Sequence, residues 1–293
     1  MKLKMIKAVL EHPLNEGRAV GALCRFFKRG VMIRLHKDPM VYPFVEGTFL
    51  LVEKGMASAE LQIYTHLYDF REMVFLLHYL RKGDDVFVDV GANVGVYTVL
   101  SAGVAGVKVI AMEPAPQTFE KLRRNVVLNG LDRLVELLNL AIGDQEGELF
   151  FTANLDAINH VVGADSQEDK IKVPSATLDK LLADKEVTCL KIDVEGFEAN
   201  VVNGAEDILR RRDLQVVIME TNGLTDQYNF GQSYLHNKLL SFGFKPCDYD
   251  PGSRKLISLD RPSDTNTIYI RDQEAAGRRV LEGRKYWIAG REF

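Results

Sequence analysis

Asp89 stands where a buried strand is predicted to end, in the stretch VFVDVGANVGVYT that runs from Val86 to Thr98. The stretch opens as an unbroken apolar run rich in β-branched residues, which is typical of a strand buried on both faces. Gly91 and Gly95 then form a turn that leads into an apolar segment with helical spacing. Because the start of a helix directs free N–H groups at whatever lies before it, the stretch predicts a nucleotide-cofactor site with a carboxylate beside it.

The spacing of these glycines does not match the fingerprint of dinucleotide-binding proteins. That fingerprint is G-x-G-x-x-G, whereas this turn reads GANVG and has Asn93 where a middle glycine would stand. Taken alone, the stretch is therefore also compatible with an ordinary turn between a strand and a helix.

Glu113 follows the next predicted strand, 22 residues after Gly91. A carboxylate at this place can accept hydrogen bonds from both hydroxyls of a ribose, in NAD or in another adenosine cofactor. Asp89 discriminates between these cofactors, because a carboxylate about 4 Å from a pyrophosphate charge costs about 4 kcal/mol. The same carboxylate attracts the cationic amino-acid end of S-adenosylmethionine, which the residues therefore favour over NAD.

Strands and helices alternate from Val86 onward, and this rhythm predicts a doubly wound, mainly parallel α/β sheet. Two strands close together near the end, with no helix between them, suggest an antiparallel edge. The expected strands are Val86 to Val90, Lys108 to Met112, Val135 to Ile142, Thr188 to Val194, Gln215 to Glu220, Phe244 to Tyr249 and Thr267 to Arg271, with extra strands at Glu148 to Thr152 and Lys170 to Val173. The expected helices are about Tyr97 to Ala105, Gln117 to Asn129, one through Gly204 to Leu209, and Ser233 to Phe242.

The chain before this rhythm is predicted to be a mainly helical extension, for which a role as a substrate cap or in homo-oligomerisation is open. Within it, the stretch from Ala19 to Phe27 is amphipathic and has basic residues near its end. Such a helix suits a membrane surface or docking on the main domain, and we favour docking. The expected division of the chain is 1–80, 81–272 for the main domain, and 273–293 for a C-terminal tail.

Composition limits the classes of function. The 293 residues are 46% hydrophobic and 27% charged, with a net charge of −4, so no overall basic field attracts nucleic acid. The three cysteines show no metal-ligand spacing and suggest a reducing compartment, so we expect a cytoplasmic protein. We expect no signal peptide and no transmembrane helix, since no apolar run reaches about 18 residues.

Four motifs, in this order, resemble the FkbM-type family of S-adenosylmethionine-dependent methyltransferases. They are FVDVGANVGVYT, the MEP around Glu113, LAIGD at 140–144 and LKIDVEGFE at 190–198. The resemblance covers roughly residues 70 to 271. It implies a class I, Rossmann-like methyltransferase domain with a seven-stranded sheet and a reversed last strand, which methylates a hydroxyl of a small molecule, natural product or sugar.

The same resemblance implies where the cofactor binds. The turn after the first strand would line the methionine part, Glu113 would hold the ribose, and the segment from Asn139 to Ala141 would border the adenine. Leu140 stands where related enzymes have an acid, which is a departure from the family pattern. The expected cofactor-binding residues are Asp89, Gly91, Asn93, Gly95, Thr98, Glu113, Pro114, Asn139 and Ala141.

A hydroxyl acceptor must also lose its proton, and a positioned base contributes about 10²–10⁴-fold. Candidate bases lie at the carboxyl ends of strands, where ligands bind in such sheets. Asp193 and Glu195 lead, followed by Glu198, His160 and Glu220. Structural roles remain open for Asp193 as a helix cap, for Glu198 as an acid at a helix start, and for His160 as a surface residue. A divalent metal held by the clustered acids has only weak support, so we expect none.

Two other functions remain open. One is an NAD-dependent oxidoreductase on a related sheet, and the other is a non-catalytic protein that binds S-adenosylmethionine. Pro246-Cys247 resembles the nucleophile pair of cytosine-C5 methyltransferases, but it does not follow the fourth strand, so a plain strand cysteine is favoured. A nucleic-acid substrate is therefore not expected.

Overall fold

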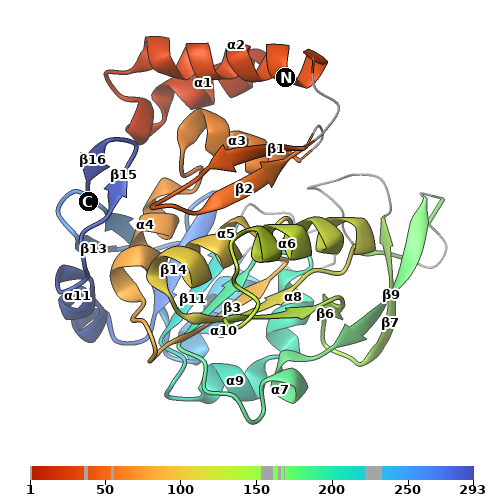
Figure 1. Ribbon diagram of the computed structural model, residues 1–293. Helices are drawn as coiled ribbons and strands as arrows, with labels where there is room; N and C mark the ends of the chain where they lie inside the picture. The colour runs from red at the N-terminus through yellow and green to blue at the C-terminus, as the bar shows by residue number, and fades with distance from the viewer. Residues whose placement is uncertain are drawn as a thin grey trace.

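Among the residues that the computed structural model describes, which are 2–35, 39–53, 56–152, 161–163, 166–167, 169–221 and 233–293, eight strands form one central sheet (Figure 1). They are β3 (Val86–Val90), β4 (Lys108–Met112), β5 (Val135–Leu138), β10 (Cys189–Ile192), β11 (Val216–Glu220), β12 (Lys245–Asp250), β13 (Lys255–Ser258) and β14 (Asn266–Ile270). Their order across the sheet is β13-β12-β14-β11-β10-β3-β4-β5. Strands β5, β4, β3, β10 and β11 run parallel, β14 runs antiparallel to both of its neighbours, and β13 runs antiparallel to β12.

The parallel part of this sheet confirms the doubly wound class, but the sheet is mixed and has one strand more than the seven expected. The additional strand, β13, forms a hairpin with β12 and lies at the edge. Its four residues are mostly exposed, and so short a run carries no clear period-two signal. The parallel strands are nearly continuous apolar runs because helices cover both of their faces.

Helices lie on both sides of the central sheet (Figure 1). They are α4 (Phe70–Tyr79), α5 (Val96–Val99), the π-helical segment η2 (Leu100–Ala105), α6 (Pro116–Leu128), α7 (Leu178–Leu181), α8 (Glu198–Asn203), α9 (Glu206–Arg210), α10 (Tyr234–Ser241) and α11 (Gln273–Leu281). Side chains alternate along a strand, so Phe87 and Val88 of β3 face opposite ways and belong to separate apolar clusters. The Phe87 cluster includes residues of α4, α5, η2, α6 and α11, and the Val88 cluster includes residues of α7, α8, α9 and α10.

The strand expected from Val135 to Ile142 is broken in the structure. Strand β5 ends at Leu138, and the side chain of Asn139 turns to donate hydrogen bonds to the carbonyl oxygens of Glu113 (2.8 Å) and Pro114 (3.0 Å). The next two residues form β6 (Ala141–Ile142), which belongs to a second sheet of order β6-β9-β7-β8. Its other strands are β7 (Gly147–Thr152), β8 (Val161–Val162) and β9 (Lys170–Ala176), so both extra strands are confirmed.

In two places the observed helices also differ from the expected ones. The helix expected from Tyr97 to Ala105 is a single turn of α5 followed by η2. The helix expected through Gly204 is divided into α8 and α9, and Gly204 lies at the division. A Cβ atom at Gly204 would lie 2.0 Å from the carbonyl oxygen of Gly143, so this close backbone contact requires a glycine. The other two helices, α6 and α10, agree with expectation to within one residue at each end.

The first part of the chain forms helices and one hairpin along one edge of the molecule (Figure 1). These elements are α1 (Lys2–Glu11), the 3₁₀ turn η1 (Pro13–Asn15), α2 (Ala19–Leu35), β1 (Met40–Pro43), β2 (Phe49–Val52) and α3 (Ala57–Thr65). The inner face of α2 packs on α3, where Arg29 Nη2 lies 2.9 Å from Glu60 Oε1, and this confirms that α2 is docked. The apolar core runs without a break from α4 into the central sheet.

The end of the chain adds α11 and a short hairpin, β15 (Trp287–Ile288) with β16 (Arg291–Glu292). Helix α11 packs on α4 and β13. Among the described helices, none combines the length and the apolar character that crossing a bilayer requires.

Candidate active site

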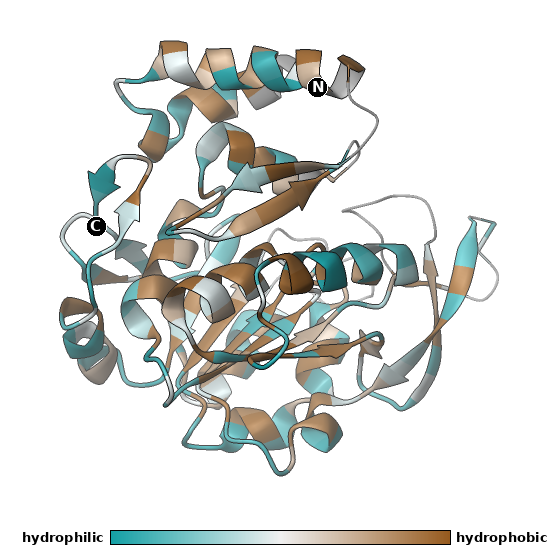
Figure 2. Cartoon of the chain, viewed as in Figure 1, coloured by the Kyte–Doolittle hydropathy of each residue, from teal (hydrophilic) through white to brown (hydrophobic). Residues whose placement is uncertain are grey.

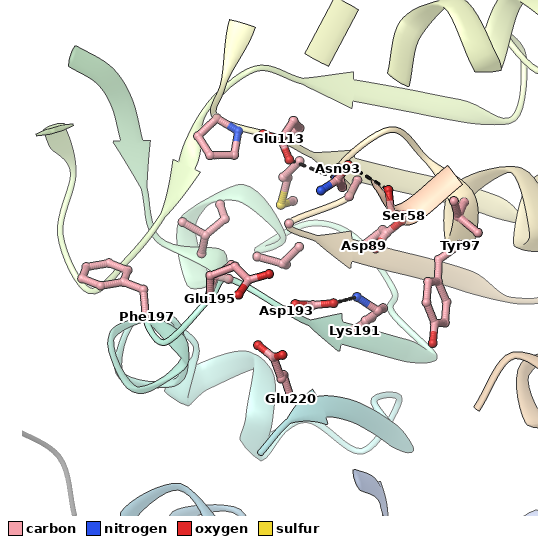
Figure 3. Close-up of a pocket in the computed structure, with 18 of the residues that line it drawn as sticks. Ser58, Asp89, Asn93, Tyr97, Glu113, Lys191, Asp193, Glu195, Phe197 and Glu220 are labelled. Carbon is pink, nitrogen blue, oxygen red and sulfur yellow. Dashed lines mark hydrogen bonds and ion pairs between the residues drawn. The ribbon is translucent and has the colours of Figure 1, made fainter. Parts of the chain in front are cut away.

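A cavity of about 260 Å³ lies at the carboxyl ends of strands β3, β4, β10 and β11 (Figure 3). Ligands of parallel α/β sheets bind at this edge. The wall comes from the turns after these strands, from the segment around β6, and from α3 with the segment that follows it. Figure 3 shows carboxylates from several strands around the cavity, and they are Asp89, Glu113, Asp193, Glu195 and Glu220.

Asp89 lies at the end of β3 beside Lys191 of β10, because the strand register pairs these two residues. Its Oδ2 accepts a hydrogen bond of 2.7 Å from Thr98 Oγ1 in α5. Its Oδ1 is buried and has no hydrogen-bond partner among the described residues. Burial raises the pKa of Asp89, and Lys191 opposes that rise. A buried carboxylate oxygen with free lone pairs in the cavity wall suits a cationic group of a ligand.

Gly91 brings the turn after β3 against the turn after β10. Its φ is +78°, in the left-handed region that favours glycine. A Cβ atom at Gly91 would lie 1.8 Å from the backbone oxygen of Asp193, so any side chain would push the two turns apart. Gly95 also has a positive φ, +88°, and is the residue from which α5 begins. These two glycines therefore fix the shape of the cavity floor.

Glu113 is held in place by backbone groups on both of its carboxylate oxygens. Its Oε2 accepts a hydrogen bond of 3.0 Å from the N–H of Asn93, and its Oε1 accepts one of 3.0 Å from the N–H of Ala115. Burial raises the pKa of Glu113 to about 7, although both of these hydrogen bonds lower it. Each oxygen keeps a second lone pair, so the side chain can still accept hydrogen bonds from a ligand.

Asn93 connects the β3 turn to the first part of the chain. Its φ is +51°, a conformation that asparagine tolerates better than most residues. Its Oδ1 accepts hydrogen bonds from the N–H of Val94 (2.8 Å) and from Ser58 Oγ (3.2 Å) of α3. The side chain thus orders the turn and ties α3 to the cavity.

The nine residues expected to bind the cofactor divide into two groups by position. Six of them line the cavity, and three support those six from outside it. The lining residues are Asp89, Gly91, Asn93, Glu113, Pro114 and Ala141, and the supporting ones are Gly95, Thr98 and Asn139. Asn139 therefore holds the backbone of Glu113 and Pro114 without lining the cavity, whereas its neighbours Leu140 and Ala141 do line it.

Asp193, Glu195 and Glu220 converge at the ends of β10 and β11 (Figure 3). Burial raises the pKa of Glu195 to about 7, with smaller contributions in the same direction from Asp193 and Glu198. Burial and, as a smaller contribution, the repulsion of Asp193 and Glu195 raise the pKa of Glu220 to about 9. Glu195 can therefore gain or lose a proton near neutral pH.

Lys191 is a buried cation at this cluster that the sequence prediction missed. Its Nζ lies 2.7 Å from Asp193 Oδ2 and 4.6 Å from the ring centroid of Tyr97. Burial alone would lower the pKa of Lys191, but Asp193 and Asp89 outweigh burial and raise it. The ammonium therefore stays charged among carboxylates. The sequence signal was available, since a lysine inside the apolar run CLKI of β10 requires a buried partner.

Residues from the first part of the chain, for which a role as a substrate cap was left open, form one wall of the cavity, and the sequence prediction named none of them individually. They are Ser58, Leu61 and Gln62 of α3, together with Tyr68 and Asp69. Asp69 Oδ2 accepts a hydrogen bond of 2.9 Å from the hydroxyl of Tyr97, and burial raises the pKa of Asp69. No local motif predicts this wall, because it depends on how α3 packs on the sheet.

The remaining candidates for a role in catalysis are Glu198, His160 and Cys247. Glu198 Oε1 accepts hydrogen bonds of 3.1 Å from the N–H groups of Val194 and Gly196, so it orders the turn after β10 and does not line the cavity. His160 lies outside the described residues. Burial raises the pKa of Cys247 to about 12, and this residue lies in β12 away from the cavity, which confirms the plain strand cysteine. Within the described ranges, no group of three or more His, Cys, Asp or Glu side chains is arranged to hold a metal ion.

Comparison with known proteins gives a match to a family model, several sequence relatives and several similar solved structures. The model of the methyltransferase FkbM domain matches residues 89–249. Hexuronic acid methyltransferase AglP of Haloferax volcanii is 29% identical over 161 residues, which cover 53% of this chain and 64% of that protein, a little under two thirds of its length. The 31-O-demethyl-FK506 methyltransferase FkbM of Streptomyces tacrolimicus is 30% identical over 185 residues, which cover 50% of this chain and 70% of that protein. Among solved structures, a precorrin-6y C5,15-methyltransferase from Geobacter metallireducens has a TM-score of 0.40 at 14% identity and covers 70% of this chain and 88% of that one.

Proposed function

Since the chain belongs to the FkbM methyltransferase family and is a methyltransferase, we propose that it transfers the methyl group of S-adenosylmethionine to a hydroxyl of a small molecule or sugar. Membership in a family of methyltransferases sets aside the NAD-dependent oxidoreductase and the non-catalytic binding protein. The names of two relatives specify a hexuronic acid and a demethylated FK506 as their targets, and this supports the proposed acceptor class.

The unpartnered Oδ1 of Asp89 is the observation that carries the choice of cofactor. A buried carboxylate with an open lone pair favours a ligand that brings positive charge and hydrogen-bond donors, and S-adenosylmethionine has both an ammonium and a sulfonium. The β3 turn also has no room for a side chain at Gly91, because a Cβ atom there would lie 1.8 Å from the backbone oxygen of Asp193. Glu113 would accept hydrogen bonds from the ribose, with Asn139 holding its backbone in place.

Methyl transfer requires an aligned acceptor and little else from the protein, because the cofactor supplies a methyl group on a good leaving group. Alignment of this kind contributes about 7–11 kcal/mol in favourable cases. The residues that can align an acceptor are those on the α3 side of the cavity, such as Gln62, Tyr68 and Asp69. We therefore propose that residues 1–80 act as a cap on the catalytic domain of residues 81–272.

Glu195 is the general base in this proposal. With a pKa near 7 its carboxylate is available at neutral pH and still basic enough to accept a proton from a hydroxyl. Asp193 is less free to do so, since its Oδ2 is paired with Lys191. The Lys191–Asp193 pair instead positions the turn from which Glu195 projects, and the ammonium stabilises negative charge that develops nearby.

Calorimetry with S-adenosylhomocysteine and with NAD tests the choice of cofactor. We expect binding of the first and none of the second. Replacement of Glu113 by Ala removes hydrogen bonds to a charged group, each worth about 1.5–3 kcal/mol, so the loss of even one should lower the affinity for S-adenosylhomocysteine roughly tenfold to a hundredfold. Glu120→Ala, on the exposed surface of α6, is the matched control and should bind as the parent does. Unchanged affinity in Glu113→Ala, or binding of NAD, would contradict the assignment.

A further inference from the structure

An apolar stripe runs along the outer face of α2. It consists of Val20, Cys24, Phe27, Val31 and Leu35, whose spacing of three or four residues puts them on one face of the helix. All five side chains are exposed, and Phe27 exposes 63% of its surface. Figure 1 shows α1 and α2 at one edge of the molecule, and Figure 2 marks the apolar segments along them. We call these five residues the α2 stripe.

The opposite face of α2 is firmly packed, so the outward direction of the α2 stripe is fixed. Ala22 is fully buried, and the ring of Phe26 lies 5.1 Å from that of Tyr64 in α3. Arg25 Nε donates a hydrogen bond of 3.1 Å to the carbonyl oxygen of Ile63, also in α3. The helix therefore does not need the α2 stripe to hold its place on the protein.

Charge is distributed very unevenly between this edge and the rest of the chain. Residues 1–35 contain eight Lys and Arg against two Glu, which gives a formal charge of +6. The whole chain has a charge of −4, so the other residues together carry −10. Lys28, next to Phe27, is exposed and makes no ion pair with a described residue. The apolar stripe thus lies in the basic part of an otherwise acidic protein.

We propose that the α2 stripe binds the surface of a bilayer that contains anionic lipids. A helix that lies in the membrane interface inserts Phe, Val and Leu side chains of one face and keeps neighbouring basic residues at the headgroups. On α2 the exposed Lys28 is placed for this contact, whereas Arg29 is buried against Glu60 and faces away from it. Anionic lipids attract the basic segment and repel the acidic remainder, so both charges favour the same orientation. A second copy of the chain suits this surface less well, because a symmetric dimer would place two segments of +6 against each other.

The position of α2 gives this binding a consequence for the cavity. Helix α2 rests on α3, and α3 supplies Ser58, Leu61 and Gln62 to the cavity wall. A bilayer bound at the α2 stripe is therefore separated from the cavity wall by a single layer of helix. Membrane binding would place the cap side of the enzyme, rather than the far side of the sheet, toward the lipid.

Sedimentation of the full chain with lipid vesicles tests the proposal. The vesicles are made of phosphatidylcholine alone or of phosphatidylcholine with phosphatidylglycerol. We expect at least roughly tenfold tighter binding to the anionic vesicles, and loss of this preference at about 0.5 M salt. The double variant Phe27→Ser, Val31→Ser should lose at least about tenfold in this affinity. The matched control is Leu281→Ser, Ile257→Ser, which removes two side chains of similar exposure (60% and 48%) from α11 and β13.

A second variant keeps the test valid if the double variant folds poorly. Lys28→Glu leaves the α2 stripe intact and reverses one charge, so it should weaken binding to the anionic vesicles alone. The proposal is overturned if the parent protein ignores anionic vesicles at low salt, or if neither variant changes its binding. It is also overturned if the α2 stripe supports a dimer in solution that the double variant abolishes, while vesicles are not bound.

Discussion

The two halves of the cavity are built in different ways. The half that we propose binds the cofactor, here called the cofactor half, contains Asp89, Gly91, Asn93 and Glu113 and consists of tight turns whose polar atoms are held mainly by nearby backbone groups. The half that we propose binds the acceptor, here called the acceptor half, has the carboxylates of Asp193, Glu195 and Glu220 near one buried ammonium and is closed by a wall from α3. The first half is arranged to hold a ligand in one position, and the second gathers carboxylates, among which burial raises the pKa of Glu195 to about 7 and that of Glu220 to about 9.

This difference indicates how binding and chemistry are divided in the proposed reaction. Positive φ values and close backbone contacts fix the cofactor half before any ligand arrives, which lowers the cost of binding. In the acceptor half, burial and, to a smaller extent, mutual repulsion raise the pKa values of Glu195 and Glu220, so these carboxylates are more basic and their ionised forms are less stable in the folded protein. Substitutions in the two halves should therefore affect different measured constants.

The largest effect is expected in the acceptor half. Glu195→Gln removes the proposed base without a change in size, so kcat should fall about 10²–10⁴-fold. Affinity for S-adenosylhomocysteine, measured by calorimetry, should stay within about twofold of the parent. The methyl acceptor for the kinetic assay can be found by mass spectrometry of extracts treated with labelled cofactor. Turnover equal to that of the parent would remove Glu195 from the mechanism.

Gly91→Ala tests the cofactor half. The new Cβ atom would collide with the backbone of Asp193 and force the two turns apart. Because overpacking of this kind costs about 1–3 kcal/mol, affinity for S-adenosylhomocysteine should fall roughly tenfold to a hundredfold. Gly277→Ala in α11, where a Cβ atom meets nothing within 4 Å, is the matched control and should leave affinity unchanged. If Gly91→Ala binds as tightly as the control, the close contact of the two turns is not needed.

The sequence predicted the carboxylates of both halves that line the cavity but none of the residues of the wall from α3, and the reason is physical. Asp89, Gly91 and Glu113 lie in short segments where a strand meets a turn, so local patterns suffice to place them. Ser58 and Asp69 reach the cavity only because α3 and α4 pack on the sheet from a distant part of the chain. No periodicity in the sequence specifies that packing.

The fold shows the same division. The parallel strands of the central sheet were predicted closely, because buried strands of this kind are continuous apolar runs. The break at Asn139 was missed because it depends on a tertiary hydrogen bond to Glu113. Lys191 was missed although its position in an apolar strand gave a local signal.

A change of pH should affect a different measured constant in each half, the Kd of S-adenosylhomocysteine in the cofactor half and kcat in the acceptor half. Glu113 and Glu195 both have pKa values raised to about 7, and each acts as a carboxylate. Both functions should therefore weaken as pH falls below 7, by roughly tenfold at pH 6. The Kd of S-adenosylhomocysteine should follow Glu113, and kcat at saturating cofactor should follow Glu195. A kcat that does not change between pH 6 and about pH 8 would show that no group of this pKa acts in turnover.

Stability should show the smallest effect. Burial raises the pKa of Glu220 from 4.5 to about 9, so the folded state holds its proton more tightly than the unfolded state. Stability from this group is present below pH 4.5 and is lost as pH rises toward 9. Glu220→Gln should therefore raise the melting temperature at about pH 8 by a few degrees, since each kcal/mol corresponds to about 2–4 °C in a chain of this size. A lower melting temperature would mean that the ionised form of Glu220 stabilises the fold.

A crystal structure of the protein with S-adenosylhomocysteine tests the central claim most directly. We expect the ribose hydroxyls within hydrogen-bonding distance of Glu113, the amino group of the ligand on the side of Asp89, and the sulfur directed toward Glu195 and Glu220. A ligand bound elsewhere, or one whose sulfur faces away from these carboxylates, would contradict the division of the cavity into a cofactor half and an acceptor half.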